Sequence, residues 1–358
     1  MRIGRSSRAR PPFSLATLAR RLGVALGSEA QGATLIAGLA SLTGARVGDL
    51  APLLSSDRMA DARSSLASAF LVPSFLPALG RPQLISDDPR RSFAELLEVF
   101  APPRRVLRGV HPSAVVDAGA EVSKDAWVGP FCYVAQGARV AAGCSLMSHV
   151  HVGEEAVLGE GCELGPHSTV LARCRLGADV ILGAGTVIGG DGFGFALDRE
   201  GNPLRLRSLS TVELSDAVEV GAHSCVDRGT LDATRVGARA KIDNLVQVGH
   251  NVEVGEGVLI CAQAGLAGSV HVGAGATLGG QAGIADGLRI GARAKVAAKS
   301  GVIGDVDDGA VVAGYPARPR TRWAREAALV AQLDDLRRVV RRRSAEAGPG
   351  RTYDEDET

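Results

Sequence analysis

One histidine and one glycine are spaced so that they can act together on an acyl group. His250 follows Val248-Gly249, and Gly268 comes 18 residues later, after Leu266-Ala267. If 18 residues form one coil of a stacked structure, Gly268 lies directly over His250 at a strand spacing of about 4.8 Å. An imidazole beside an unobstructed backbone N–H provides a general base next to an oxyanion donor. Acyl transfer to an amine or a hydroxyl group requires this pair.

Two carboxylates are candidates for orienting the imidazole. Asp243 precedes His250 in the same run of sequence, and Asp286 lies two coils further on. We expect Asp286 to be too far away unless another subunit helps. The alternative is that His250 is an ordinary solvent-facing side chain. Further histidines at outward positions also leave open a three-histidine zinc site, as in β-helical carbonic anhydrases: His149, His151, His167, His223 and His271.

The element that must position these residues is an internal hexapeptide repeat. Aliphatic-Gly pairs recur at multiples of six, with the aliphatic residue at 152, 158, 164, 176, 182 and 188, and again at 248, 254, 272, 278 and 290. Repeats of this kind bury their apolar sides only by stacking on their neighbours. The period predicts a mainly β protein built on a left-handed parallel β-helix, in which three hexapeptides form one triangular coil.

A second small residue stands four positions after the aliphatic residue and is expected to point into the coil. Four of the six cysteines occupy this position: Cys132, Cys144, Cys162 and Cys174. Zinc sites and short disulfide frameworks need close pairs such as C-x-x-C, and the sequence has none. We interpret the cysteines as buried thiols, which fits a reducing compartment and a cytoplasmic location.

Composition excludes several classes of function. The chain has 358 residues and a net charge of +1, which gives no electrostatic signature of nucleic-acid binding. No window has the length and apolarity of a membrane span. The basic start of the chain is followed by an amphipathic pattern at residues 13–22, which does not resemble a signal peptide.

The repeat divides the chain into four parts. Residues 1–105 lack it and alternate helical stretches (13–23, 58–69, 91–100) with apolar runs (33–40, 68–73, 83–86), which predicts a small α/β domain. Residues 106–315 form the β-helix, interrupted by insertions at 190–211 and 227–235. Residues 316–346 contain an amphipathic, arginine-rich helix at about 321–343, and 347–358 form a tail expected to be disordered.

Several motifs give the chain a resemblance to a known family. They occur in one order along residues 15–335: His111-Pro112-Ser113-Ala114, Gly190-Asp191-Gly192-Phe193-Gly194-Phe195, Val226-Asp227-Arg228-Gly229, Ile242-Asp243-Asn244, Val248-Gly249-His250-Asn251, Ala267-Gly268-Ser269, Gly279-Gly280-Gln281, Gly314-Tyr315-Pro316 and Trp323. With these motifs the chain resembles the UDP-3-O-(3-hydroxyacyl)glucosamine N-acyltransferases of lipid A biosynthesis.

The resemblance implies a homotrimer with active sites between adjacent β-helices. It implies a 3-hydroxyacyl thioester on acyl carrier protein as donor, a UDP-3-O-acylglucosamine amine as acceptor, and neither a metal nor another cofactor. His250 would be the general base, the Gly268 amide the oxyanion donor and Asp243 the support of the base. The substrate-binding residues would be Asp191, Phe193, Phe195, Asn244, Gln247, Asn251, Asp286 and Arg58. The basic C-terminal helix would help to pack the trimer and meet the acidic carrier protein.

The sequence departs from the family pattern at two places. Pro52, Ser55 and Arg58 stand where the family has the Phe, Asn and Tyr that bind uracil, although the Arg58 guanidinium can stack on a base. Gly287 stands where a second histidine is expected. Two alternatives therefore remain: an acyltransferase for a different nucleotide sugar, and a non-catalytic trimeric scaffold that binds sugar nucleotides.

Overall fold

The computed structural model describes residues 12–102, 107–314 and 320–346. The chain divides into two compact units, residues 1–106 and 107–358. The predicted tail at 347–358 lies outside the described residues. No helix in the described ranges is long and apolar enough to cross a membrane.

The N-terminal unit is built around a five-stranded sheet in the order β2-β7-β6-β5-β4, with β1 and β3 paired separately. Its strands are β1 (Phe13–Ser14), β2 (Ala25–Leu26), β3 (Leu35–Ile36), β4 (Gly38–Leu39), β5 (Asp49–Pro52), β6 (Ala69–Val72) and β7 (Gln83–Ile85). Its helices are α1 (Leu15–Leu22), α2 (Met59–Ser64) and α3 (Pro89–Phe100), with 3-10 turns at Glu29–Gln31, Ser56–Arg58 and Pro77–Leu79.

One prediction about this unit needs correction. The helix expected at 58–69 is shorter, because α2 ends at Ser64 and Ser65 adopts an extended conformation. The segment that carries Pro52, where the family resemblance places uracil-binding residues, forms β5, which pairs in parallel with β4 and β6. Leu50 and Ala51 of β5 are fully buried, so this segment is part of the core of the unit.

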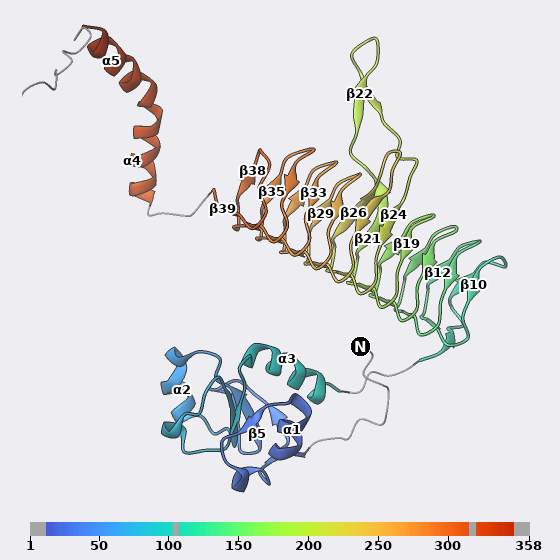
Figure 1. Ribbon diagram of the computed structural model, residues 1–358. Helices are drawn as coiled ribbons and strands as arrows, with labels where there is room; N and C mark the ends of the chain where they lie inside the picture. The colour runs from blue at the N-terminus through green and yellow to red at the C-terminus, as the bar shows by residue number, and fades with distance from the viewer. Residues whose placement is uncertain (1–11, 103–106, 315–319, 347–358) are drawn as a thin grey trace, which may run out of the picture. The chain divides into compact units, whose positions relative to one another are not determined.

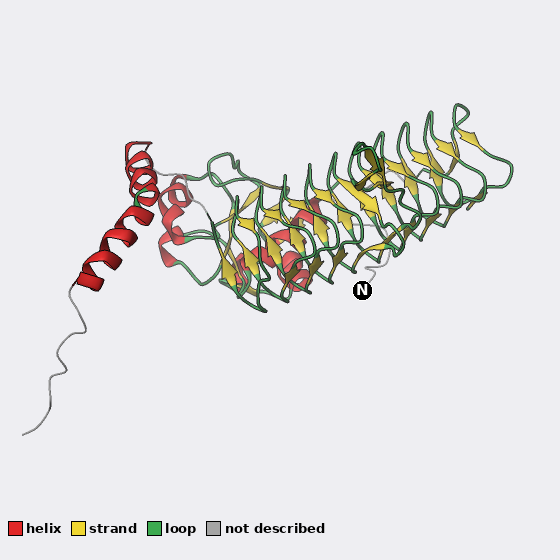
Figure 2. Ribbon diagram, turned by 90° about the horizontal axis from the view of Figure 1, so that it is seen from above, coloured by secondary structure: helices red, strands yellow, loops and turns green. Residues whose placement is uncertain are grey.

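The second unit begins with a three-sided parallel β-helix, which confirms the fold predicted from the repeat (Figures 1 and 2). Each coil adds one short strand to each of three parallel sheets, here called the first, second and third walls. Partner strands on neighbouring regular coils are offset by 18 residues, as between Val248 and Leu266. The expected stacking of Gly268 over His250 follows from this register.

The strands of each wall are as follows. The first wall contains β8 (Gly109–Val110), β11 (Trp127–Val128), β14 (Ser145–Leu146), β17 (Glu163–Leu164), β20 (Ile181–Leu182), β25 (Glu219–Val220), β28 (Lys241–Ile242), β31 (Leu259–Ile260), β34 (Thr277–Leu278), β37 (Lys295–Val296) and β39 (Val311–Val312). The second contains β9 (Val115–Val116), β12 (Tyr133–Val134), β15 (His151–Val152), β18 (Thr169–Val170), β21 (Val187–Asp191), β26 (Cys225–Arg228), β29 (Gln247–Val248), β32 (Gly265–Leu266), β35 (Gly283–Ile284) and β38 (Gly301–Val302). The third contains β10 (Glu121–Val122), β13 (Arg139–Val140), β16 (Val157–Leu158), β19 (Arg175–Leu176), β24 (Val212–Leu214), β27 (Thr234–Val236), β30 (Glu253–Val254), β33 (His271–Val272) and β36 (Arg289–Ile290).

Three rows of turns join the walls. We call them the first corner (first to second wall), the second corner (second to third wall) and the third corner (third to first wall). His250, Gly268 and Asp286 are the middle residues of three successive turns of the second corner, after β29, β32 and β35. Both insertions leave the coils at this corner. The longer one forms a hairpin of β22 (Phe195–Leu197) and β23 (Pro203–Arg205), which projects from the solenoid (Figure 1).

The core of the β-helix follows the repeat. The second residue of most strands is buried, and so is the small residue that precedes the next strand. Cys132, Cys144, Cys162 and Cys174 are at most 2% exposed, which confirms their predicted place inside the coil. All six cysteines are free, and burial raises the pKa of the Cys174 thiol.

Glycine is needed after the aliphatic residue of each aliphatic-Gly pair for a different reason from the one expected. We expected it to relieve strain at a tight corner, but a Cβ on Gly153 would instead lie 2.6 Å from the Ala172 nitrogen of the next coil. The left-handed conformation falls two residues later, where side chains are common, as at His149 and Asn251 (φ 61° and 60°). Close stacking of the coils therefore selects these glycines.

After residue 319 the chain forms α4 (Arg320–Ala331) and α5 (Leu333–Glu346), where one helix at 321–343 was expected. Gln332 separates them, and its N–H donates to the Leu329 carbonyl. Several apolar side chains of the pair are more than half exposed: Leu329, Val330, Leu333, Leu336, Val339 and Val340. Residues 320–346 contain eight arginines and four acidic residues.

Candidate active site

The tautomer of His250 is fixed by its neighbour Asn251. The distance from His250 Nδ1 to Asn251 Oδ1 is 3.1 Å, and the same oxygen accepts the Thr230 N–H at 3.0 Å. An amide oxygen only accepts, so Nδ1 carries the proton of the neutral imidazole and Nε2 is left with its lone pair free. Nε2 is therefore the basic atom of this side chain.

Asn251 is held by the shorter insertion. Its Nδ2 donates to the Asp232 carbonyl at 2.9 Å, and its own N–H donates to Thr234 Oγ1 at 2.9 Å. These contacts determine which end of the amide faces the imidazole. The resemblance implies that Asn251 binds substrate; in the structure its side chain contacts His250 Nδ1, so it can also set the orientation and tautomer of the ring.

Gly268 presents a backbone N–H that makes no hydrogen bond to any described residue. At three equivalent turns of the other corners a side chain from a neighbouring coil caps this group. Asp216 accepts the Ala178 N–H, Asn244 accepts the Ala222 N–H and Asp308 accepts the Ala292 N–H, each at 2.7 Å. The Gly268 N–H is therefore free to bind an external acceptor such as an oxyanion.

The missing side chain of Gly268 leaves a gap that two other side chains enter. A Cβ at this position would lie 2.6 Å from His250 Cε1, 2.7 Å from His250 Nε2 and 3.0 Å from Asp286 Oδ1. Asp286 was expected to be out of reach of His250 within one chain, but here both approach the same glycine. Gly192 of the longer insertion also lies close to His250. A Cβ added to Gly192 would be 2.7 Å from the His250 Cβ, so the longer insertion packs tightly against the histidine.

Asp227 belongs to this site, although its role was not foreseen from the sequence. Gln247 Nε2 donates to Asp227 Oδ2 at 2.8 Å. Burial raises the pKa of Asp227 to about 6; His250 and the Gln247 hydrogen bond oppose this rise, and Asp191 adds to it. The structure thus brings Asp191, Asp227, Gln247 and His250 together, because β21 and β26 run on past the second wall and pair there.

A buried arginine supports the same region. Arg228 is 7% exposed, and its Nε and Nη2 donate to the carbonyls of Gly189 and Ala172 at 2.7 and 3.2 Å. It connects three coils where the longer insertion begins. The sequence signal for Asp227 and Arg228 was their position at the start of an insertion, since insertions on one side of a solenoid often form its site.

Two predicted site residues lie at a different corner. Asp243 accepts the N–H groups of Asn244 and Ala262 at 2.7 and 3.1 Å, and Asn244 caps the Ala222 turn. Both belong to the first corner, whereas His250 belongs to the second. Within one chain Asp243 therefore stabilises turns and does not support the base; a role toward His250 would require Asp243 of another copy.

The predicted aromatic pair lies on the projecting hairpin. Phe193 and Phe195 are 87% and 47% exposed, and their rings meet edge to face with centroids 5.1 Å apart. Leu197, Leu204 and Leu206 are also exposed. An exposed apolar patch of this kind is typical of a surface that binds an apolar ligand or another chain. It starts one residue after Gly192, which contacts His250.

Arg58 lies in the N-terminal unit. Its Nε and Nη2 donate to Asp61 Oδ2 at 2.9 and 2.7 Å, and its side chain is 51% exposed. The ion pair uses one edge of the guanidinium group, so the plane of the group remains available for stacking.

The remaining histidines are spread over several surfaces. His149 and His167 stack at the first corner with centroids 4.6 Å apart, and Phe131 packs on His149 at 5.0 Å. His151 lies on the second wall and His271 on the third. No group of three or more His, Cys, Asp or Glu side chains is placed to hold a metal ion within the described ranges.

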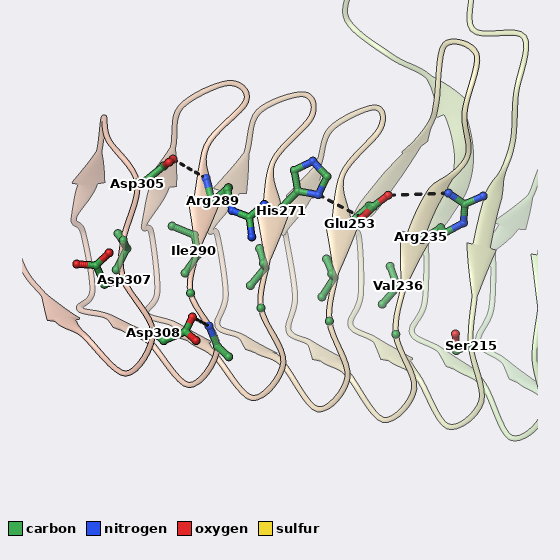
Figure 3. A pocket seen from close by; sticks show the side chains of 18 of the residues that line it. Ser215, Arg235, Val236, Glu253, His271, Arg289, Ile290, Asp305, Asp307 and Asp308 are labelled. Carbon is green, nitrogen blue, oxygen red and sulfur yellow. Dashed lines mark hydrogen bonds and ion pairs between the residues drawn. The ribbon is translucent and has the colours of Figure 1, made fainter.

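A groove of about 840 Å³ runs along the third wall, away from His250 (Figure 3). Its side chains alternate in charge and pair with one another: Arg235 with Glu213 at 3.2 Å, and His271 with Glu253 at 3.2 Å. Exposed ion pairs of this kind contribute little to the stability of the folded protein. His271, the histidine that lines this groove, is paired with Glu253, whereas His250 Nε2 at the second corner has no partner among the described residues.

The fold and the site together define a hexapeptide-repeat acyltransferase. Residues 155–190 match the family model "Bacterial transferase hexapeptide (six repeats)". A UDP-3-O-acylglucosamine N-acyltransferase of Syntrophotalea carbinolica is 51% identical over 309 residues, which cover 86% of this chain and 90% of the relative. UDP-3-O-acylglucosamine N-acyltransferase 3 of Gloeobacter violaceus is 48% identical over 301 residues, covering 84% and 87%. The chain belongs to the UDP-3-O-acylglucosamine N-acyltransferase family.

A solved structure supports the fold independently. The Arabidopsis UDP-N-acetylglucosamine acyltransferase aligns with a TM-score of 0.53 and 24% identity over 57% of this chain and 71% of its own. At this identity the likeness concerns the fold alone.

Proposed function

We propose that this protein transfers a 3-hydroxyacyl chain from acyl carrier protein to the 2-amino group of UDP-3-O-(3-hydroxyacyl)glucosamine, forming a precursor of lipid A. One observation carries the proposal: the free Nε2 of His250 faces a glycine whose N–H has no partner among the described residues. This is the base and oxyanion donor that acyl transfer to an amine requires.

The mechanism follows from the two groups. His250 Nε2 takes a proton from the acceptor amine as the nitrogen attacks the thioester carbon. The Gly268 N–H stabilises the oxygen, which gains negative charge as the C–N bond forms. When the intermediate collapses, the C–S bond breaks and the imidazolium returns its proton to the thiolate. Asn251 keeps Nδ1 protonated throughout, so that only Nε2 exchanges protons. The thioester is already activated, and this scheme uses neither a metal nor another cofactor.

The exposed hairpin fits the apolar part of the substrates. Phe193 and Phe195 follow directly after the glycine that contacts His250, so an acyl chain that leaves the reacting carbon can lie against their rings. The N-terminal unit binds the uridine in this proposal, with Arg58 stacking on the base. The arginine-rich pair α4 and α5 meets the acidic carrier protein.

Self-association into a homotrimer is part of the proposal. The first residue of each second-wall strand is uncharged or histidine along all ten strands. At the adjoining first corner, Phe131, Met147 and Leu245 are 63%, 47% and 53% exposed. An uncharged wall beside exposed apolar side chains is suited to burial against another copy. His250 lies in the second corner, which forms one long edge of the second wall. The site would therefore lie at the edge of this contact.

The test is a single-turnover assay with 3-hydroxyacyl carrier proteins of several chain lengths and UDP-3-O-acylglucosamine. We expect transfer by the wild type and a loss of about 100-fold or more in His250→Ala, as for removal of a general base. An unchanged rate in the variant would overturn the assignment of the base. Transfer only to another nucleotide sugar would favour the first alternative, and binding without transfer at any donor length would favour a scaffold.

A further inference from the structure

Asp286 occupies a turn position at which other polar residues cap a backbone N–H, but it makes no such cap. At the equivalent position one coil beyond Ala178, Ala222 and Ala292, the residues Asp216, Asn244 and Asp308 each cap the N–H of the preceding turn. Asp286 stands one coil beyond Gly268 but does not cap its N–H. In the described part of the chain its carboxylate makes neither a hydrogen bond nor an ion pair.

The Asp286 carboxylate instead lies at the gap above Gly268. Its Oδ1 is 3.0 Å from the place that a Gly268 Cβ would occupy, and His250 Nε2 is 2.7 Å from the same place. The carboxylate and the basic nitrogen therefore flank one small space. Asp286 is exposed, so it does not need a partner for burial and is available to a bound molecule.

We propose that Asp286 binds the acceptor amino group and makes this site select an amine over a hydroxyl. The inference rests on the proposed function. The neutral amine that attacks carries two N–H bonds, so it can donate one hydrogen bond to His250 Nε2 and the other to the Asp286 carboxylate while its lone pair faces the thioester carbon. A hydroxyl has a single hydrogen, which His250 must take, and its lone pairs would then face the carboxylate oxygens.

The electrostatics favour the same discrimination. A carboxylate accepts hydrogen bonds from a cation more strongly than from a neutral donor. As the C–N bond forms, the amine nitrogen gains positive charge between Asp286 and Nε2, and this offsets the negative charge that Asp286 brings near the oxyanion position. A hydroxyl that gives its single proton to His250 has no hydrogen left to donate to Asp286, so the carboxylate charge then opposes the transition state. Asp286 thus determines acceptor specificity, while His250 and Gly268 serve either acceptor.

The experiment compares two acceptors that differ at one atom: UDP-3-O-acylglucosamine and the same molecule with a hydroxyl at C2. The hydroxyl analogue is measured both as a substrate and as a competitive inhibitor. For Asp286→Asn we expect kcat/KM for the amine to fall about 10- to 100-fold, the effect of one charge-assisted hydrogen bond. The hydroxyl analogue should react or bind at least as well as with the wild type.

Two further variants complete the design. Asp286→Glu keeps the charge and should recover part of the preference for the amine. Asp308→Asn alters the equivalent turn position at the third corner and should leave the ratio of the two acceptors unchanged. Thermal unfolding of each variant shows whether the fold is intact.

The outcomes separate this inference from the proposed function. If the wild type acylates the amine and His250→Ala does not, but Asp286→Asn keeps the wild-type ratio, the role of Asp286 is wrong and the function stands. If the wild type acylates neither acceptor, the proposed function fails and this inference fails with it. A fall in kcat/KM of Asp286→Asn for the amine alone, with the hydroxyl analogue unaffected, supports both the proposed function and the role of Asp286.

Discussion

The second corner of the β-helix and its other two corners use the same turn for different purposes. At three turns of the first and third corners, Asn244, Asp216 and Asp308 cap the N–H of the preceding coil. At the second corner the N–H of Gly268 makes no hydrogen bond to a described residue, and the His250 ring lies beside it. The repeat itself thus supplies an N–H suited to an oxyanion, and in the proposed function the one at Gly268 must stay uncapped.

The two insertions explain why a histidine is held in a fixed orientation at this corner. Both leave the coils at the second corner, immediately before the turn of His250. The shorter insertion holds Asn251 through Thr230 and Asp232. The longer one packs Gly192 against the histidine. The coils thus provide stacking at a fixed spacing, and the insertions convert one stacked pair into a base with a defined tautomer.

The strongest way to break the contrast between the corners is to fill the gap above Gly268. In Gly268→Ala the new Cβ would lie within 3.0 Å of both His250 and Asp286, so we expect the ring to be displaced and transfer to fall about 100-fold or more. Gly304→Ala is the matched control, since Gly304 is the middle residue of a later turn at the same corner and a Cβ there meets nothing within 4 Å. Equal rates for the two variants in single turnover would contradict the assignment.

A smaller effect is expected when the hydrogen bond that fixes the His250 tautomer is removed. Asn251→Ala removes the acceptor that keeps Nδ1 protonated, so part of the histidine population carries its proton on Nε2. We expect kcat to fall about 10- to 100-fold with KM little changed, as for other residues that orient a reacting group. Asp216→Ala, which uncaps a turn at the third corner, should lower stability by about 1 kcal/mol and leave kcat unaltered. A loss of kcat in the control and not in Asn251→Ala would reverse the interpretation.

The smallest effect concerns Asp227 and the pH dependence of stability. Its pKa rises from 3.8 to about 6 on folding, so the folded protein binds the proton more tightly than the unfolded chain. Ionisation of Asp227 therefore lowers stability as the pH rises from about 4 to above 6. Asp227→Asn should be more stable than the wild type by about 1 kcal/mol at pH 7.5, allowing for solvent screening, and equal to it near pH 4.

Urea unfolding of the two proteins at both pH values measures this difference. Gln247 can still donate its hydrogen bond to the side-chain amide oxygen that the Asp227→Asn substitution introduces, so the packing of the site is preserved. A difference that is the same at pH 4 and pH 7.5 would show that the carboxylate charge is not its cause.

Much of the fold was predictable because the repeat is visible in the sequence as a regular spacing of aliphatic and small residues. Six residues per wall and 18 per coil place His250 under Gly268 and turn Cys132 and Cys162 inward. The same counting places Asp243 one hexapeptide before His250, and therefore at another corner; the family resemblance had suggested a closer relation. The strand at Asp49–Pro52 was not among the apolar runs expected from the sequence, because the run is short and carries a proline.

The sequence by itself determined the coil, its core and the stacked pair of base and N–H donor, because covalent spacing and the burial of aliphatic residues act locally and repeat regularly. The tertiary structure alone decided which partners complete the site. Asn251 fixes the tautomer, Asp227 lies beside the base, and Asp286 reaches the gap above Gly268 because the insertions return to one corner and a glycine leaves room there. The paths of insertions and the direction of side chains depend on packing between distant segments, which spacing in the sequence does not specify.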